Sequence, residues 1–105
     1  AYAAEMLFTG NRYGADDALR MGMVNRVVDY SDLEDTVREI AGTIAANAPL
    51  TLKSVKTSIR NTQMDESGRD MADVQAQIVA CFASEDYKEG QTAFMEKRKP
   101  DFKGK

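Results

Sequence analysis

The sequence predicts a mainly α-helical protein with at most one short strand, near residues 23–28. Apolar residues recur at three- and four-residue steps through most of the chain, which is the period of a helix. Only one segment is rich in β-branched residues with a loose alternation, which is the pattern of a strand. With 105 residues, the chain is long enough for one small domain or for a part of a larger one.

The composition excludes several kinds of chemistry. The chain has no His and one Cys, so it lacks the imidazole of hydrolase triads and the commonest ligand of transition metals. A single Cys forms no disulfide within the chain, and we expect the protein to be located in the reducing environment of the cytoplasm. No run of 18 apolar residues and no signal-peptide pattern is present, so we expect no membrane partner. Because the chain has no His, we also expect no metal site.

Charge is distributed unevenly along the chain. The formal net charge is −3, yet residues 97–105 contain five Lys or Arg and only one acid. The overall acidity argues against binding to nucleic acid. The basic tail suits a phosphate-bearing ligand or an acidic neighbour, although a solvated tail is the simpler interpretation.

The first 30 residues are predicted to form two short helices and an extended segment. The first helix ends at Gly10, and the second, of about two turns, follows Gly14. The segment MVNRVV at 23–28 is the one candidate strand. Because no second strand is predicted, this segment either packs as an extended chain or pairs with residues outside these 105.

Two helices are predicted next, over 32–46 and 50–60. Ser31 and Glu34 have the spacing of a capping box at the start of the first helix, and Pro49 is suited to open the second. The apolar residues of their predicted inner faces are Leu33, Val37, Ile40 and Ile44 in the first and Leu52, Val55 and Ile59 in the second.

A polar loop over 61–68 is predicted to precede two more helices, over 68–83 and 85–98. Ser84 is placed to cap the last helix, which Pro100 stops. The apolar stripe of the helix at 68–83 consists of Met71, Val74, Ile78, Cys81 and Phe82.

Several side chains that could carry chemistry have simpler explanations. Lys53, Lys56 and Arg60 share one helix face, which is more often solvated than bound to phosphate. Cys81 lies on an apolar stripe without a basic neighbour in sequence, so we expect a buried, unreactive thiol. Acidic pairs occur at helix starts, where capping accounts for them, and no general acid/base pair is recognisable.

Phe94 and Lys97 form the one arrangement that suggests a ligand. They are three residues apart on the last predicted helix, so they project from one face near its end. An aromatic ring beside a cation could stack on a flat ligand while the ammonium meets a phosphate. From spacing alone, however, a core Phe94 and a surface Lys97 are the simpler interpretation.

Three segments of the chain together resemble a known family. They are EMLFTGNRYGADDALRMGMVNRVVD, IAANAPLTLKSVKTSI and SEDYKEGQTAFMEKRKPDFKGK, and in this order they resemble the C-terminal part of the enoyl-CoA hydratase/isomerase (crotonase) family. The resemblance implies the C-terminal helical region of a crotonase (ClpP/crotonase-like) fold. Residues 1–30 would then end the crotonase core, residues 31–105 would form a helical oligomerisation region, and the chain would be a fragment.

The resemblance also implies a function for the larger protein. The reaction that the resemblance implies is the addition of water to a 2-enoyl-CoA thioester, with acyl-CoA as substrate and no cofactor, in trimers or hexamers of identical chains. The oxyanion hole and catalytic Glu residues of the family lie upstream, so we expect no catalytic residue here and no activity of the chain alone. By resemblance, Phe94 and Lys97 approach the CoA or acyl pocket. A stand-alone helical interaction module without catalysis is the alternative, and other reactions of the family stay open.

Overall fold

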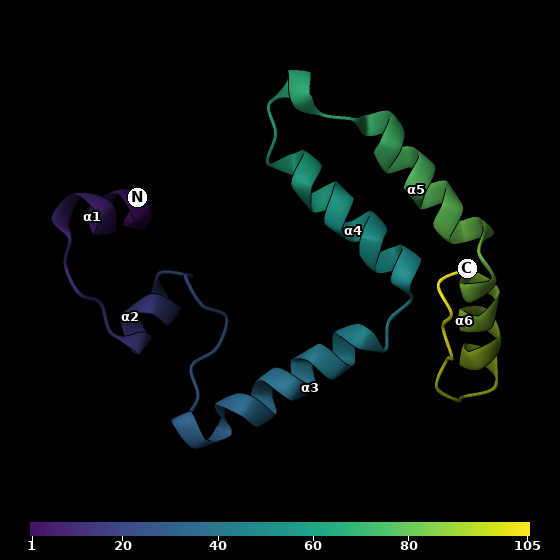
Figure 1. The fold of residues 1–105 in the computed structure, drawn as a ribbon, viewed down its shortest axis with the longest axis horizontal. Coiled ribbons are helices and arrows are strands. Elements are labelled where there is room, and N and C mark those ends of the chain that lie inside the picture. The colour runs from purple at the N-terminus through teal and green to yellow at the C-terminus, as the bar shows by residue number, and fades with distance from the viewer. The chain divides into compact units, whose positions relative to one another are not determined.

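A computed structural model describes residues 1–105, and it contains helices, turns and irregular segments without a strand (Figure 1). The chain divides into two compact units, Ala1–Arg38 and Glu39–Lys105. None of the helices is long and apolar enough to cross a membrane. The prediction of a mainly α-helical chain is therefore confirmed, whereas the assignment of 1–30 to a core and 31–105 to oligomerisation stays a prediction.

The first unit contains helices α1 (Tyr2–Thr9) and α2 (Ala15–Arg20). Gly10 has a φ of 62° and donates its N–H to the Met6 carbonyl at 3.0 Å. This left-handed residue stops α1, as glycine does at many helix ends. Both short helices were predicted from Gly10 and Gly14 and are confirmed.

The segment at 23–28 forms no strand. It is irregular, and Val24, Val27 and Val28 are each about two fifths exposed. A strand exists only where a second one pairs with it, and these 105 residues provide none. Within these 105 residues the segment is irregular, and its pairing with residues outside them stays a prediction.

The predicted capping box before the next helix is wrong. Ser31 lies inside a 3₁₀ turn, η1 (Tyr30–Asp32), and its hydroxyl donates to the Asp32 carboxylate at 3.2 Å instead of accepting from Glu34. The helix itself, α3 (Leu33–Ala45), forms where the apolar period predicts it and contains the boundary between the two units. Its apolar side chains stay between 39% and 55% exposed.

The second unit continues with α4 (Pro49–Thr62), α5 (Met71–Ala83) and α6 (Glu85–Met95). Pro49 opens α4, as predicted. The loop predicted over 61–68 is wrong in part, because α4 runs on to Thr62 and Glu66–Gly68 forms a 3₁₀ turn, η2.

Asn61 explains why the connection between α4 and α5 is ordered. It is buried, its amide donates to the Thr57 carbonyl at 3.0 Å, and its Oδ1 accepts the Asp70 N–H at 2.7 Å. Asp70 in turn accepts the Asp73 N–H at 2.8 Å and caps α5. A polar residue that seemed to begin a loop therefore joins two helices.

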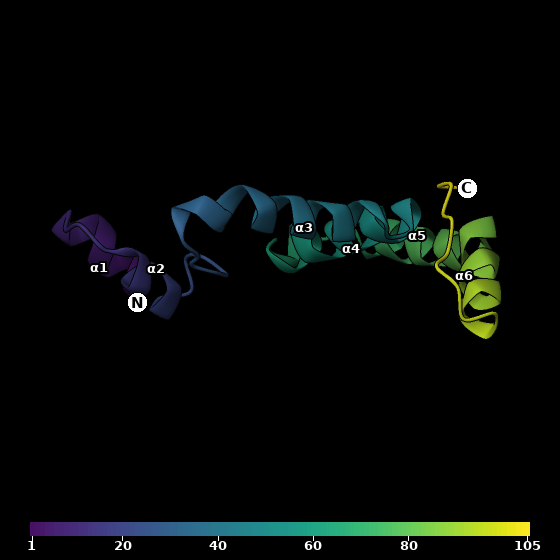
Figure 2. The same ribbon diagram turned by 90° about the horizontal axis from the view of Figure 1, so that it is seen from below.

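In this unit α4 packs beside α5, and α5 contacts α6 (Figures 1 and 2). Only Val74 and Ala93 are buried apolar residues, and the predicted inner-face residues Val55 and Ile59 are about half exposed. Such a small layer of helices cannot enclose every apolar stripe that it presents. Considerable apolar surface is consequently left open.

Candidate functional site

The C-terminal segment 96–105 turns back along α6 and is held there (Figure 2). Asp86, in the first turn of α6, is only 3% exposed. Its carboxylate accepts the N–H groups of Lys103 at 2.6 Å and Gly104 at 2.8 Å, and its own N–H donates to the Lys105 carbonyl at 3.1 Å. One acid therefore secures the last three residues.

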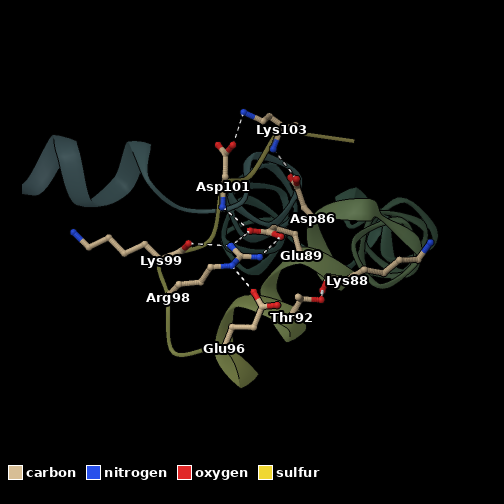
Figure 3. A network of polar contacts seen from close by, with 9 residues as sticks. All are labelled: Asp86, Lys88, Glu89, Thr92, Glu96, Arg98, Lys99, Asp101 and Lys103. Carbon is tan, nitrogen blue, oxygen red and sulfur yellow. Dashed lines mark hydrogen bonds and ion pairs between the residues drawn. The ribbon is translucent and has the colours of Figure 1, made fainter.

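Glu89, about one turn further along α6, holds the middle of the same segment (Figure 3). Its two carboxylate oxygens accept from Arg98 Nη1 at 2.6 Å and Nη2 at 2.9 Å, and Oε1 also accepts the Asp101 N–H at 2.9 Å. The Nε of Arg98 donates to Glu96 at 2.6 Å. Hydrogen bonds from Arg98 and from the Asp101 N–H lower the pKa of Glu89 from 4.5 to about 2, and those to Glu89 and Glu96 raise the pKa of Arg98.

Lys97 lies in the turn that reverses the chain. Its φ is 54°, the only positive φ of a residue other than glycine. Its N–H donates to the Phe94 carbonyl at 3.2 Å, and the Arg98 N–H donates to the Ala93 carbonyl at 3.0 Å. This pair of bonds is the Schellman motif, in which glycine usually occupies the left-handed position. A side chain there costs about 1–2 kcal/mol.

This turn corrects the predicted end of the last helix. Helix α6 stops at Met95, so Lys97 is not on its surface as the helix predicted over 85–98 requires. Ser84 does cap α6, because its hydroxyl accepts the Tyr87 N–H at 3.0 Å. The start of the helix was predictable from a capping residue, whereas its left-handed end was not, since Lys rarely adopts that conformation.

Packing supplements these hydrogen bonds. A Cβ on Gly90 would lie 3.6 Å from the Phe102 ring, so the ring rests directly on α6. At Gly104, where φ is 76°, a Cβ would lie 3.5 Å from Pro49 at the start of α4. The segment thus covers α6 and reaches α4.

A largely apolar hollow of about 570 Å³ opens beside this segment. The rings of Phe82 and Tyr87 meet edge to face there, with centroids 5.1 Å apart. Phe94 belongs to the lining and is 83% exposed. The other contributions come from α4, α5, α6 and the C-terminal segment, and include Ile78, Cys81 and Phe102.

The predicted site residues are both accessible. Phe94 is not a core residue, so the simpler interpretation of it is wrong. Lys97 is exposed, and none of the six ion pairs of the chain includes it. That these two residues bind CoA stays a prediction.

Other expectations about side chains have mixed outcomes. Cys81 is half-buried in the wall of the hollow and not fully buried as predicted. Lys53, Lys56 and Arg60 are exposed along α4. No group of three or more His, Cys, Asp or Glu is arranged to hold a metal ion.

The sequence interpretation missed the role of Asp86 and Glu89. They are three residues apart, so they face the same side of α6, and a basic segment follows the helix. That combination was the available signal. It was overlooked because acids in the first turn of a helix are already explained by the helix dipole.

Comparison with known proteins decides the family. A model of the enoyl-CoA hydratase/isomerase family matches residues 1–105. The chain belongs to this family. Among curated family members, it is 40% identical over 97 residues to a short-chain-enoyl-CoA hydratase of Clostridium acetobutylicum, covering 92% of this chain and 37% of that protein. It is also 40% identical over 109 residues to a carnitinyl-CoA dehydratase of Escherichia coli, covering 100% and 42%.

Solved structures of family members share the fold. An enoyl-CoA hydratase of Geobacillus kaustophilus superimposes with a TM-score of 0.82 at 39% identity, covering 99% of this chain and 40% of that one. An enoyl-CoA hydratase of Mycobacterium marinum gives 0.86 at 32% identity, covering 99% and 41%. The chain therefore has the helical architecture of crotonase-fold enzymes and spans about two fifths of the length of these relatives.

Proposed function

We propose that this family member is the C-terminal region of an acyl-CoA enzyme that adds water to a 2-enoyl-CoA thioester. The names of the relatives support this reaction, since they include a short-chain-enoyl-CoA hydratase, a crotonyl-CoA hydratase and a carnitinyl-CoA dehydratase. The chain contributes no catalytic residue, requires no cofactor and acts in the cytoplasm. Its own part is to complete the CoA site and to hold copies of the protein together.

Phe94 and Lys97 carry the CoA part of this proposal. The single observation behind it is that an exposed ring and an exposed, unpaired cation lie three residues apart around one reversal of the chain. The flat adenine of CoA stacks on such a ring, and a phosphate accepts charge-assisted hydrogen bonds from an ammonium. In the assembled enzyme, these two side chains contact CoA at a subunit boundary.

Titration with CoA tests this part. We expect CoA to shift the amide resonances of Phe94 and Lys97 in the chain, and Lys97→Ala to weaken binding about fivefold, as for the loss of one exposed charge-assisted bond. Lys99→Ala is the matched control, because the Lys99 ammonium points away from the network in Figure 3. Equal weakening by both variants would indicate attraction to net charge only and would contradict a built site.

The exposed apolar faces support self-association into trimers or hexamers. Leu33, Val37 and Ile44 of α3 are each about half exposed, and apolar patches of this kind are usually covered by a partner. We expect light scattering to show that the mass rises with concentration. A compact monomer at every concentration would contradict this part of the proposal.

A stand-alone helical interaction module is the second candidate function. The same exposed apolar faces favour it, because a different protein could equally cover them. The two candidates differ in one observable: a module without CoA chemistry shows no CoA-dependent shift at Phe94 or Lys97.

A further inference from the structure

The backbone of Lys97 needs support from its surroundings. Its φ of 54° is a conformation that residues with a side chain seldom adopt, and such residues persist only where neighbouring structure holds them. The two closing bonds to Phe94 and Ala93 define the turn, but they do not explain why a lysine occupies it. The next question is what holds the chain on the far side of Lys97.

Glu89 provides that support. It binds Arg98, the residue directly after Lys97, through both carboxylate oxygens, and it binds the backbone of Asp101 through one of them (Figure 3). The side chain of Arg98 also donates to Glu96, the residue directly before Lys97. Both neighbours of Lys97 are therefore tied into one network that is anchored on α6.

Asp86 does not serve the same purpose. Its carboxylate holds Lys103 and Gly104, which are six and seven residues beyond Lys97. Loss of that contact frees the end of the segment, whereas loss of Glu89 frees the residues next to the turn. The two acids can therefore be distinguished by which amides each one protects.

We propose that Glu89 is a positioning residue for CoA recognition, which holds Arg98 and Asp101 so that the turn presents the Lys97 ammonium in one fixed place. The inference rests on the proposed function of Lys97 and assigns to Glu89 no contact with CoA. A bidentate carboxylate–guanidinium pair is suited to this task because it fixes direction as well as distance. The geometry requires the negative charge of Glu89, since a neutral amide cannot accept from Arg98 through two oxygens.

The first test is the variant Glu89→Gln in the chain of 105 residues. We expect amide hydrogen exchange of Lys97, Arg98 and Asp101 to accelerate by about tenfold, because the segment opens locally more often, and the affinity for CoA to fall by about threefold. The matched control is Glu85→Gln, which removes an exposed pair with Lys88 on the same helix and should change neither quantity. Unchanged exchange in Glu89→Gln would overturn the inference.

A double-mutant cycle distinguishes positioning from general stability. If Glu89 acts through Lys97, Glu89→Gln has no further effect on CoA affinity in a chain that already carries Lys97→Ala. Affinity is compared at a temperature where thermal unfolding shows all four proteins to be folded. The same threefold loss in both backgrounds would mean that Glu89 acts independently of Lys97, and the inference would be wrong.

The cycle also separates this inference from the proposed function on which it rests. If Lys97→Ala leaves CoA binding unchanged, the proposed role of Lys97 fails, and the positioning role fails with it. If Lys97→Ala weakens binding but Glu89→Gln does not, only the positioning role of Glu89 is refuted.

Discussion

The Glu89 carboxylate accepts two hydrogen bonds from the Arg98 guanidinium, Nη1 to Oε1 at 2.6 Å and Nη2 to Oε2 at 2.9 Å. This pair closes the reversal of the chain after α6. The most distinctive motif of the sequence, SEDYKEG followed by FMEKRKPDFKGK, therefore has a largely structural explanation. Two of its exposed side chains, Phe94 and Lys97, have no part in holding the segment through side-chain hydrogen bonds or ion pairs.

Two replacements of Lys97 distinguish the effect of its backbone conformation from the effect of its side chain. Lys97→Gly keeps the left-handed turn and removes its steric cost, so we expect the free energy of unfolding to rise by about 1 kcal/mol. Lys97→Ala removes the same ammonium and retains the cost, so its stability should stay close to that of the parent chain. Urea denaturation measures both.

Affinity for CoA should not follow stability in this pair. Both variants lack the ammonium and should bind CoA about fivefold more weakly, although one is more stable than the parent chain. If Lys97→Gly bound CoA as tightly as the parent, the lysine side chain would have no role in recognition.

Asp86 offers a test of the hydrogen bonds at the end of the segment. Asp86→Ala removes the buried carboxylate that accepts the N–H groups of Lys103 and Gly104, which should destabilise the chain by about 1–3 kcal/mol. Asp101→Ala is the control, because the side chain of Asp101 forms only an exposed pair with Lys103, and its loss should cost less than about 1 kcal/mol. Equal losses in urea denaturation would show that burial of Asp86 has no special effect.

The secondary structure was largely predictable because its signals are local. Apolar periods predicted α3 to α5, Ser84 and Pro100 predicted α6, and Gly10, Pro49 and Ser84 predicted helix ends that the structure confirms. No strand forms at 23–28 within these 105 residues, because a strand depends on a partner elsewhere in space. The predicted burial of Val55 and Ile59 was wrong for a similar reason. An apolar stripe shows which face of a helix would be buried, but not whether another element is present to cover it.

The candidate site was predictable in its residues but not in its geometry. Phe94 and Lys97 were identified from their spacing, yet that spacing placed both on a helix. The structure instead ends α6 at Met95 and reverses at Lys97. The reversal brings Glu89 and Arg98, nine residues apart, into a contact that no helical period encodes.

The two glycines of the C-terminal motif should respond in opposite directions to alanine. At Gly90, in the interior of α6, a Cβ would meet Phe102 at an ordinary contact distance of 3.6 Å, so Gly90→Ala should stabilise the chain by about 0.5–1 kcal/mol through helix propensity. At Gly104, a φ of 76° disfavours any side chain, so Gly104→Ala should destabilise it by about 1 kcal/mol. Urea denaturation gives both signs, and a loss of stability in Gly90→Ala would mean that Phe102 packs more closely than described.

A low pH should release the C-terminal segment 96–105, because Glu89 becomes protonated. Arg98 and the Asp101 N–H lower the pKa of Glu89 from 4.5 to about 2 in the folded chain. Because this pKa lies below its unfolded value, the contribution of the carboxylate is complete above about pH 4.5 and is lost as the pH falls towards 2.

The amide resonance of Asp101 reports this loss directly, because its N–H donates to Glu89. We expect it to titrate with a midpoint near 2 in the parent chain. Other carboxylates lie near the segment, namely those of Asp86, Glu96 and Asp101. The control is therefore Glu89→Gln, in which the part of the titration due to Glu89 should disappear. A midpoint near 4.5 in the parent chain would show that Arg98 does not hold Glu89 in solution, because a free carboxylate titrates there.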